Sequence, residues 1–153
     1  MLDIDGVVAD VRHRLHHLQS RPKDWPAFFA AAAADPVLEE GLHLAAELAA
    51  THELGWLTGR PERLRRVTSE WLVEYGLPPS PLRMRRSGDF RPAREMKLEV
   101  IYHLAGEAPI GLVVDDDPLV VEALASAGIP VLLADWVPYA EPLRTGQERD
   151  GRT

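Results

Sequence analysis

Leu2-Asp3-Ile4-Asp5-Gly6, near the start of a chain of 153 residues, is the stretch from which the fold can be predicted. A short apolar run that ends in two carboxylates and a glycine is typical of a β-strand whose last residues leave the edge of a sheet. In parallel α/β sheets, ligands bind at this edge, where the carboxyl ends of the strands meet. Residues two apart on a regular strand point to the same face, but where the chain leaves the strand they point in different directions. We therefore expect one of the two carboxylates to contact a substrate in line while the other transfers protons.

The first strand is short. Only Met1 and Leu2 precede Asp3, whereas a buried central strand usually needs about five residues. Either this strand forms only weakly, or residues before Met1 complete it. A weakly anchored Asp3 would be poorly oriented for in-line attack, so this feature bears on catalysis.

Composition limits the class of protein. The length fits one domain with a hydrophobic core of its own. With 17 basic and 24 acidic side chains, the net charge is −7, so the protein as a whole is not built to coat nucleic acid, although a local basic patch is compatible with this count. The chain has no cysteine, which excludes thiol nucleophiles, cysteine-ligated zinc and disulfides. Without a membrane-length apolar run or a signal peptide before the first motif, we expect a cytoplasmic protein.

Strand-like and helix-like stretches alternate along the rest of the chain, which predicts a parallel sheet covered by helices. Further strands are expected at 52–57, 81–85, 110–114 and 130–134. Helices are expected at 25–34, 37–50, 61–75, 92–104 and 118–128, with Asp24 and Asp117 as N-caps and Asp35-Pro36 as a helix break. We predict a Rossmann-like three-layer α/β domain over 1–146, with a five-stranded, mostly parallel sheet and a minimal helical insertion at 12–50. The polar tail at 147–153 is predicted to be disordered.

Polar side chains end three of the strand-like runs. They are Asp3 with Asp5, then Thr58, then Asp115 with Asp116. If these strands are parallel neighbours, the side chains meet at one edge of the sheet, beside Lys97 on the helix that follows 92. Carboxylates that close together cannot all stay ionised without a cation, and hard oxygen ligands suit Mg²⁺. The metal and Lys97 would together neutralise a phosphoryl group that enters beside Asp3.

Four motifs in this order resemble those of the haloacid dehalogenase-like phosphohydrolases. They are Asp3-Ile4-Asp5-Gly6-Val7-Val8, Leu57-Thr58-Gly59-Arg60, Lys97 and Val114-Asp115-Asp116. The resemblance covers nearly the whole chain. Four motifs in order, each at the end of the expected element, make a specific signal.

The resemblance implies a role for each motif residue. Asp3 would be the nucleophile that forms an aspartyl-phosphate, and Asp5 would protonate the leaving oxygen and then activate water. Thr58 would hydrogen-bond a phosphoryl oxygen, and Lys97 would hold Asp3 and the phosphate in place. The implied Mg²⁺ ligands are Asp3, the main-chain carbonyl of Asp5, and Asp115, with Asp116 binding directly or through water.

A closer resemblance is to the phosphatase half of bacteriophage polynucleotide kinase and 3′-phosphatase. It rests on Thr58-Gly59-Arg60, Arg85-Arg86-x-Gly88-Asp89-x-Arg91, Lys97-Leu98-Glu99 and Asp115-Asp116. It implies a nucleotide or nucleic-acid 3′-phosphate as substrate, bound by Gly59, Arg60, Arg86 and Arg91. No Gly-x-x-x-x-Gly-Lys-Ser/Thr phosphate loop is present, so no kinase half is expected in this chain. No obligate protein partner is indicated.

Other interpretations stay open. The chain could be a phosphatase of small metabolites, or a catalytically weak relative that binds phosphate or nucleotide, which the short first strand favours. The arginine-rich segment 83–94 is either a substrate-binding loop or a solvated loop that balances an acidic chain. His13, His16 and His17 fit a surface or lid role better than a metal site, because no matching carboxylate pattern lies nearby.

Overall fold

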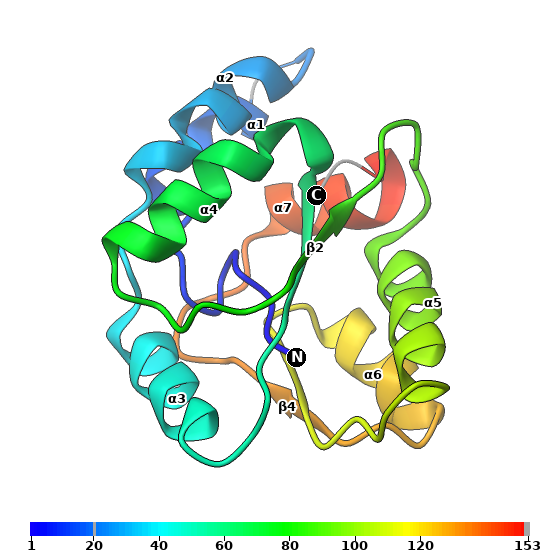
Figure 1. Cartoon of the computed structure of the whole chain (residues 1–153). Coiled ribbons are helices and arrows are strands. Elements are labelled where there is room, and N and C mark those ends of the chain that lie inside the picture. Colours follow the sequence, from blue (N-terminus) through cyan, green and yellow to red (C-terminus); the bar gives the residue numbers. More distant parts are fainter. Residues whose placement is uncertain (20, 152–153) are drawn as a thin grey trace.

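The computed structural model describes residues 1–19 and 21–151. Its strands are β1 (Trp56–Pro61), β2 (Leu82–Arg85), β3 (Val113–Asp115) and β4 (Val131–Leu133). β1 pairs with β2 and β3 pairs with β4, both in parallel. Helices flank the strands on both sides (Figure 1), which is the layered α/β arrangement that the alternating sequence predicts.

Leu2 connects the two strand pairs. It forms single parallel bridges with Trp56 and with Val114. The Leu2 N–H donates to the Gly55 carbonyl, and the Asp3 N–H donates to the Val114 carbonyl, each at 2.9 Å. The predicted first strand is therefore reduced to single bridges, and the predicted five-stranded sheet is present as two two-stranded parallel sheets.

The strand is short because the chain turns immediately after it. The Ile4 carbonyl accepts hydrogen bonds from the backbone N–H groups of Val8 at 2.9 Å and Ala9 at 2.8 Å. Gly6 lies inside this loop with a φ of 74°, a conformation that glycine adopts without strain. Asp3 is consequently held between the carboxyl ends of β1 and β3, with Asp5 in the loop above them.

Helical segments fill the connections between these strands. They are η1 (Arg12–Arg14), α1 (His16–Gln19), α2 (Trp25–Ala30), η2 (Ala31–Ala34), α3 (Glu39–Ala49), η3 (Glu62–Leu64), α4 (Arg65–Glu74), α5 (Ala93–Ala105), α6 (Pro118–Ser126), α7 (Glu141–Thr145) and η4 (Gly146–Asp150). The two predicted N-caps are confirmed, since Asp24 accepts from the Ala27 N–H and Asp117 from the Leu119 N–H, both at 2.9 Å. None of these helices is both long and apolar enough to cross a membrane.

β1 begins and ends later than the sequence predicts. The strand was expected at 52–57, but it extends from Trp56 to Pro61 because Thr58 continues the pairing with β2, opposite Met84. The Thr58-Gly59-Arg60 motif thus belongs to the strand itself. The following helix starts as η3 at Glu62 rather than at Pro61.

Three apolar clusters form the core. One lies between the strands and α3 and α4, and includes Trp56 and Trp71. A second packs α5 and α6 against β1 and β3, and includes Met96 and Ile101. The third lies under the insertion, where Phe28 of α2 packs with residues from α1 and α7. The three clusters leave the carboxyl edge of the strands to polar side chains.

The segment after residue 146 differs from the predicted disordered tail. Gly146–Asp150 forms η4, and Gln147 is buried. Lys23 forms a 2.7 Å ion pair with Asp150, and Arg94 pairs with Glu148. α7 and η4 therefore lie between the insertion and α5 (Figure 1), held by polar contacts that hydropathy alone does not reveal. Residues 152 and 153 of the predicted tail lie outside the described residues.

Candidate active site

Three carboxylates meet at the carboxyl edge of the strands. One oxygen from each of Asp3, Asp115 and Asp116 lies within 4.8 Å of the others, and the three residues are only 2%, 1% and 5% exposed. Asp3 follows Leu2, Asp115 ends β3, and Asp116 follows it. We call these three residues the acidic cluster. Their convergence is what the sequence predicts for neighbouring parallel strands.

Lys97 joins two members of this cluster. Its Nζ donates to Asp3 Oδ2 at 2.5 Å and to Asp115 Oδ2 at 2.6 Å. Burial alone would lower the pKa of Lys97, but the carboxylates of Asp115 and Asp3 outweigh burial and raise it, which favours the charged form of the lysine. The other Asp3 oxygen, Oδ1, accepts the Ile4 N–H at 2.7 Å. Both oxygens of Asp3 are thus fixed in direction.

The acidic cluster carries more negative charge than Lys97 compensates. Burial raises the pKa of Asp115 to about 7, against the lowering effect of Lys97. Burial, with Asp115 and Asp3, also raises the pKa of Asp116 well above its usual range. Asp116 Oδ1 is buried and has no hydrogen-bond partner among the described residues. An unsatisfied carboxylate oxygen within a compact set of hard oxygen ligands fits a divalent cation such as Mg²⁺.

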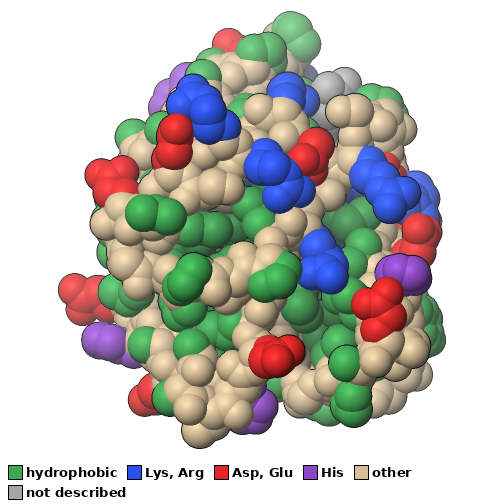
Figure 2. All heavy atoms as spheres, in the orientation of Figure 1, with side chains coloured by type: hydrophobic (Ala, Val, Ile, Leu, Met, Phe, Trp, Pro, Cys, Tyr) green, Lys and Arg blue, Asp and Glu red, His purple; other side chains and the backbone are tan. Residues whose placement is uncertain are grey.

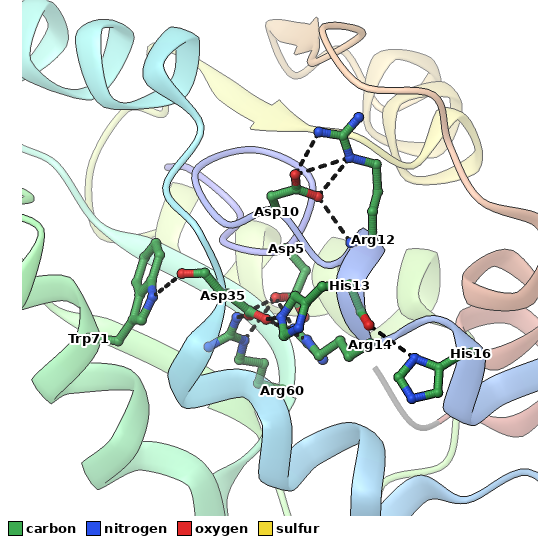
Figure 3. A network of polar contacts seen from close by, with 9 residues as sticks. All are labelled: Asp5, Asp10, Arg12, His13, Arg14, His16, Asp35, Arg60 and Trp71. Atoms are coloured by element: carbon green, nitrogen blue, oxygen red, sulfur yellow. Dashed lines mark hydrogen bonds and ion pairs between the residues drawn. The ribbon is translucent and has the colours of Figure 1, made fainter.

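Asp5 is held by two buried arginines (Figure 3). Its Oδ1 accepts from Arg60 Nη2 at 2.5 Å, from Arg60 Nε at 2.9 Å and from Arg14 Nη2 at 2.9 Å. Asp5 Oδ2 has no hydrogen-bond partner within residues 1–19 and 21–151. Burial would raise the pKa of Asp5, but Arg60 and Arg14 outweigh burial and lower it. The arginines therefore hold one oxygen of Asp5 and leave the other without a side-chain hydrogen bond among the described residues.

A second carboxylate, Asp35, supports both arginines. Arg14 donates to it from Nε at 2.7 Å and from Nη2 at 2.8 Å, and Arg60 Nη2 donates at 2.6 Å. The Asp35 carbonyl accepts the Trp71 Nε1–H at 2.8 Å. We call Asp5, Arg14, Arg60 and Asp35 the Asp5 network. Arg14 was not among the predicted site residues, and Asp35 was predicted only as a helix break.

Thr58 lies fully buried within β1, next to Leu57, whose N–H donates to the Leu2 carbonyl at 2.9 Å. The Thr58 hydroxyl accepts the Arg60 N–H at 3.2 Å. The structure thus brings the predicted hydroxyl to the same edge as Asp3. This arrangement of a carboxylate pair, a hydroxyl, a lysine and a candidate metal site suits phosphoryl transfer.

Comparison with known proteins agrees with this geometry. Residues 1–135 match the family described as the polynucleotide kinase PNKP phosphatase domain. The chain belongs to this family. Recognition of the sequence as a haloacid dehalogenase-like phosphatase domain, related to polynucleotide kinase/phosphatase, is therefore confirmed.

Two solved structures have the same fold as this PNKP phosphatase domain. One, titled "Structure of Pnkp1/Rnl/Hen1 complex", has a TM-score of 0.74 and 19% identity over 90% of this chain and 45% of the matched chain. The other, titled "Structure of the Pnkp1/Rnl/Hen1 RNA repair complex", has a TM-score of 0.72 and 20% identity over 92% and 42%. The chain thus spans less than half the length of each of these two solved chains. A search of curated proteins found no match.

The three arginines predicted to bind substrate in this chain do not lie together. Arg60 is fully buried in the Asp5 network, so its side chain is already engaged. Arg91 is exposed and pairs with Asp89 at 2.8 Å and with Glu99. Arg86 is exposed at the end of β2. The structure therefore does not gather these three arginines around Asp3.

Arg85, which was not among the predicted site residues, is buried at the end of β2. Its Nε donates to the Gly59 carbonyl at 3.3 Å and its Nη1 to the Arg91 carbonyl at 2.9 Å. Burial lowers the pKa of Arg85, and the nearby carboxylates of Asp89 and Asp3 offset this effect only in part. Arg85 is the last residue of β2, in which apolar residues and arginines alternate. An arginine at the carboxyl end of such a strand is the sequence signal that could have identified it.

His13 and His16 each have a polar partner within the insertion. His13 Nε2 lies 2.7 Å from Asp35 Oδ1, and His16 Nδ1 lies 3.0 Å from the His13 carbonyl. Over residues 1–19 and 21–151, the acidic cluster is the only set of acidic or histidine side chains arranged to hold a metal ion. His13 and His16 are exposed, which agrees with their predicted surface role.

Residues after the family match also reach the site. The Trp136 Nε1–H donates to the Val7 carbonyl at 3.1 Å, in the loop that carries Asp5. The Tyr139 hydroxyl donates to Gln147, and burial together with Asp117 raises the pKa of Tyr139. The segment 136–151 thus forms one wall of the site beside Asp116 and Asp117.

Proposed function

We propose that this domain hydrolyses phosphomonoesters with Mg²⁺ through an aspartyl-phosphate on Asp3. The observation that carries the proposal is the buried contact of Lys97 with both Asp3 and Asp115, beside Asp116, whose Oδ1 lacks a partner. A nucleophilic carboxylate needs cations around it, because it must approach a phosphate group that is itself negatively charged. The site provides Lys97 and a set of metal ligands for this purpose.

The proposed reaction has two steps. A carboxylate oxygen of Asp3 forms a bond to phosphorus while the bond from phosphorus to the ester oxygen breaks, and the leaving oxygen takes a proton from Asp5. Asp5 then removes a proton from water, and the water oxygen attacks phosphorus and breaks the bond to Asp3. Free phosphate and the original carboxylate of Asp3 result.

The Asp5 network suits the second step directly. Arg14 and Arg60 lower the pKa of Asp5, so its carboxylate is ionised and ready to accept a proton from water. In the first step Asp5 must carry a proton, and the negative charge of a bound phosphate raises a neighbouring carboxyl pKa. We infer that substrate binding prepares Asp5 as the acid, and that departure of the leaving group prepares it as the base.

Mg²⁺ would be held by Asp3, the main-chain carbonyl of Asp5, and Asp115, with Asp116 binding directly or through water. A bound Mg²⁺ ion supplies charge neutralisation for the phosphoryl oxygens. Gly6 supports this assignment, because a Cβ at this position would lie only 2.0 Å from Asp116 Oδ2. The loop and Asp116 are therefore closely fitted, which leaves Asp116 little freedom to turn away.

For substrate we propose a nucleotide or nucleic-acid 3′-phosphate. The family description supports this class, and one matched structure is titled as an RNA repair complex. Thr58, Lys97 and Arg85 would contact the phosphoryl group, with Gly59 beside them. Arg86 and Arg91 would contact the substrate farther from phosphorus, whereas Arg60 acts through Asp5. A small-metabolite phosphate is the second candidate.

Phosphate release tests the proposal. A 3′-phosphorylated oligonucleotide, the matching 3′-mononucleotide and an aryl phosphate are compared with Mg²⁺ and with chelator. We expect Mg²⁺-dependent release, highest for the oligonucleotide, and loss of turnover in Asp3→Asn with an unchanged circular dichroism spectrum. Preference for the mononucleotide or the aryl ester would move the assignment to small molecules. Turnover that survives in Asp3→Asn would refute the role of the nucleophile.

A second measurement separates an enzyme from a weak binding relative. Beryllium fluoride with Mg²⁺ mimics a phosphorylated aspartate, so it should raise the melting temperature of the wild-type protein strongly, and that of Asp3→Asn little. A protein that only binds nucleotide would respond to nucleotide and not to the fluoride. No phosphate release together with no fluoride response would favour the binding relative.

A further inference from the structure

A groove lies between the edge strand β2 and helix α5. We call it the β2–α5 groove. It encloses a cavity of about 460 Å³. Its lining includes apolar side chains from both elements, namely Leu82, Met84, Met96, Val100 and Leu104. Such a lining can accept the flat apolar face of an aromatic group.

Arginines lie along the β2–α5 groove, and two of them have free guanidinium groups. Arg83 and Arg86 line the groove and form no side-chain hydrogen bond or ion pair anywhere in residues 1–19 and 21–151. The acidic side chains of the lining are already neutralised, because Glu62 pairs with Arg65 and because Asp89 and Glu99 pair with Arg91. In Figure 2, Lys and Arg side chains gather over β2 and the loop that joins it to α5. On a chain with a net charge of −7, this is a local site for an anion.

An exposed aromatic ring lies in the same loop. Phe90, between Arg86 and Arg91 in sequence, is 60% exposed. Most other aromatic side chains of the chain are in the core, including Trp25, Phe28 and Trp71. Exposed aromatic rings interleaved with arginines are the means by which proteins bind single-stranded nucleic acid, through base stacking and phosphate contacts.

The groove begins close to the catalytic edge. Leu2 bridges Trp56, and Trp56 pairs with Leu82 in β2, so the chain segment that carries Asp3 is two strand spacings, about 10 Å, from β2. Arg86 directly follows β2 at the carboxyl edge, where Asp3 lies. A strand whose terminal phosphate is at Asp3 would therefore reach Arg86 within about two nucleotides.

We infer that the β2–α5 groove binds the single-stranded nucleic acid that precedes the terminal 3′-phosphate, with Arg83 and Arg86 on its phosphodiesters and Phe90 stacked on a base. This inference rests on the proposed function, since it adds a path for the strand to the proposed site. It assigns substrate contacts to Arg83 and Phe90, which the motifs do not include. It also explains how an acidic protein would prefer a polymer end to a small phosphate ester.

The test is a substrate-length series. Phosphate release is measured with Mg²⁺ for 3′-phosphorylated oligonucleotides from one to about six nucleotides long, over a range of salt concentrations. For wild type, KM should fall at least tenfold with length and then level off. In Arg83→Ala and Phe90→Ala, the KM of the longest substrate should rise about tenfold relative to that of the mononucleotide. Arg83→Ala should also reduce the salt dependence of binding by about one released ion.

The matched control is Arg66→Ala, which removes the same charge from α4, where Arg66 pairs with Glu70 outside the groove. It should keep the wild-type length dependence. A wild-type KM independent of length, or length dependence that persists in both groove variants, would overturn the inference while the phosphatase assignment stands. Absence of phosphate release from every substrate would instead refute the proposed function. Circular dichroism and melting curves establish that each variant is folded.

Discussion

Arg60 and Asp35 form an ion pair of 2.6 Å in which both side chains are fully buried. Arg60 belongs to β1, whereas Asp35 lies between η2 and α3 in the insertion. The same guanidinium also contacts Asp5, so the insertion is tied to the loop that carries the proposed acid and base. The insertion thereby determines how Asp5 is oriented.

Asp35→Asn should therefore lower both stability and turnover. The change leaves Arg14 and Arg60 buried with one carboxylate between them, and breaking a buried ion pair costs about 3–5 kcal/mol. We expect a melting temperature lower by about 10 °C and a decrease in kcat for every phosphate ester. Asp10→Asn is the control, since its partner Arg12 is largely exposed, and its melting temperature should stay near that of wild type. Equal melting temperatures for the two variants would contradict this account.

Gly6→Ala should weaken Mg²⁺ binding. Gly6 has a φ of 74°, and a Cβ there would overlap Asp116 Oδ2 at 2.0 Å, so the new methyl group must displace a proposed metal ligand. Gly76→Ala is the control, because its φ of 66° carries similar backbone strain with no atom within 4 Å. Mg²⁺ titration of aryl phosphate hydrolysis should give a midpoint raised at least tenfold for Gly6→Ala only. A matching rise for Gly76→Ala would point to general destabilisation.

Arg85→Lys should raise KM for all phosphate esters, including the aryl phosphate. Lysine keeps the charge but loses the fork with which Arg85 reaches the Gly59 and Arg91 carbonyls. We expect an increase of about tenfold in KM, a change of about 1.4 kcal/mol in binding. Arg83→Lys, two residues earlier on β2, should affect the oligonucleotide more than the aryl ester. If the two variants changed KM equally for the aryl phosphate and the oligonucleotide, Arg85 would have no special role in binding the phosphate group.

The metal-free protein should lose stability as pH rises. Burial raises the pKa of Asp115 to about 7, above the value of about 3.9 expected in the unfolded chain. Between these values the folded state binds more protons than the unfolded state, so the free energy of unfolding decreases from about pH 4 to about pH 7. Bound Mg²⁺ replaces the proton and should remove this decrease. Melting temperatures measured across this pH range, with Mg²⁺ and after its removal, test the expectation. The same pH dependence under both conditions would count against a metal at Asp115.

The acidic cluster was predictable because its position depends on local patterns. Asp3 and Asp115 each follow a strand-like run, and Lys97 lies near the start of the helix that packs beside them. Their meeting needs only the rule that parallel strands share an edge. The weak first strand was also visible in the sequence, because two apolar residues cannot form a full strand. The structure accordingly has bridges at Leu2 in place of a strand.

The Asp5 network was not predictable in the same way. Asp35 precedes a proline after a run of alanines, which has a sufficient local explanation as a helix break. Its partners, Arg14 and Arg60, are 21 and 25 residues away, and no periodic pattern links them. The order of the segment after residue 146 was missed for the same reason, since Glu148 and Asp150 find their partners only in the folded chain.

The wall formed by 136–151 matters for anyone who prepares this domain. A fragment cut at residue 135, where the family match ends, would lack Leu143 and would uncover the apolar surface of Trp25 and Phe28. Newly exposed aromatic surface of this kind promotes aggregation. Expression boundaries for related domains are therefore better drawn from the packing of the last helices than from the extent of sequence similarity.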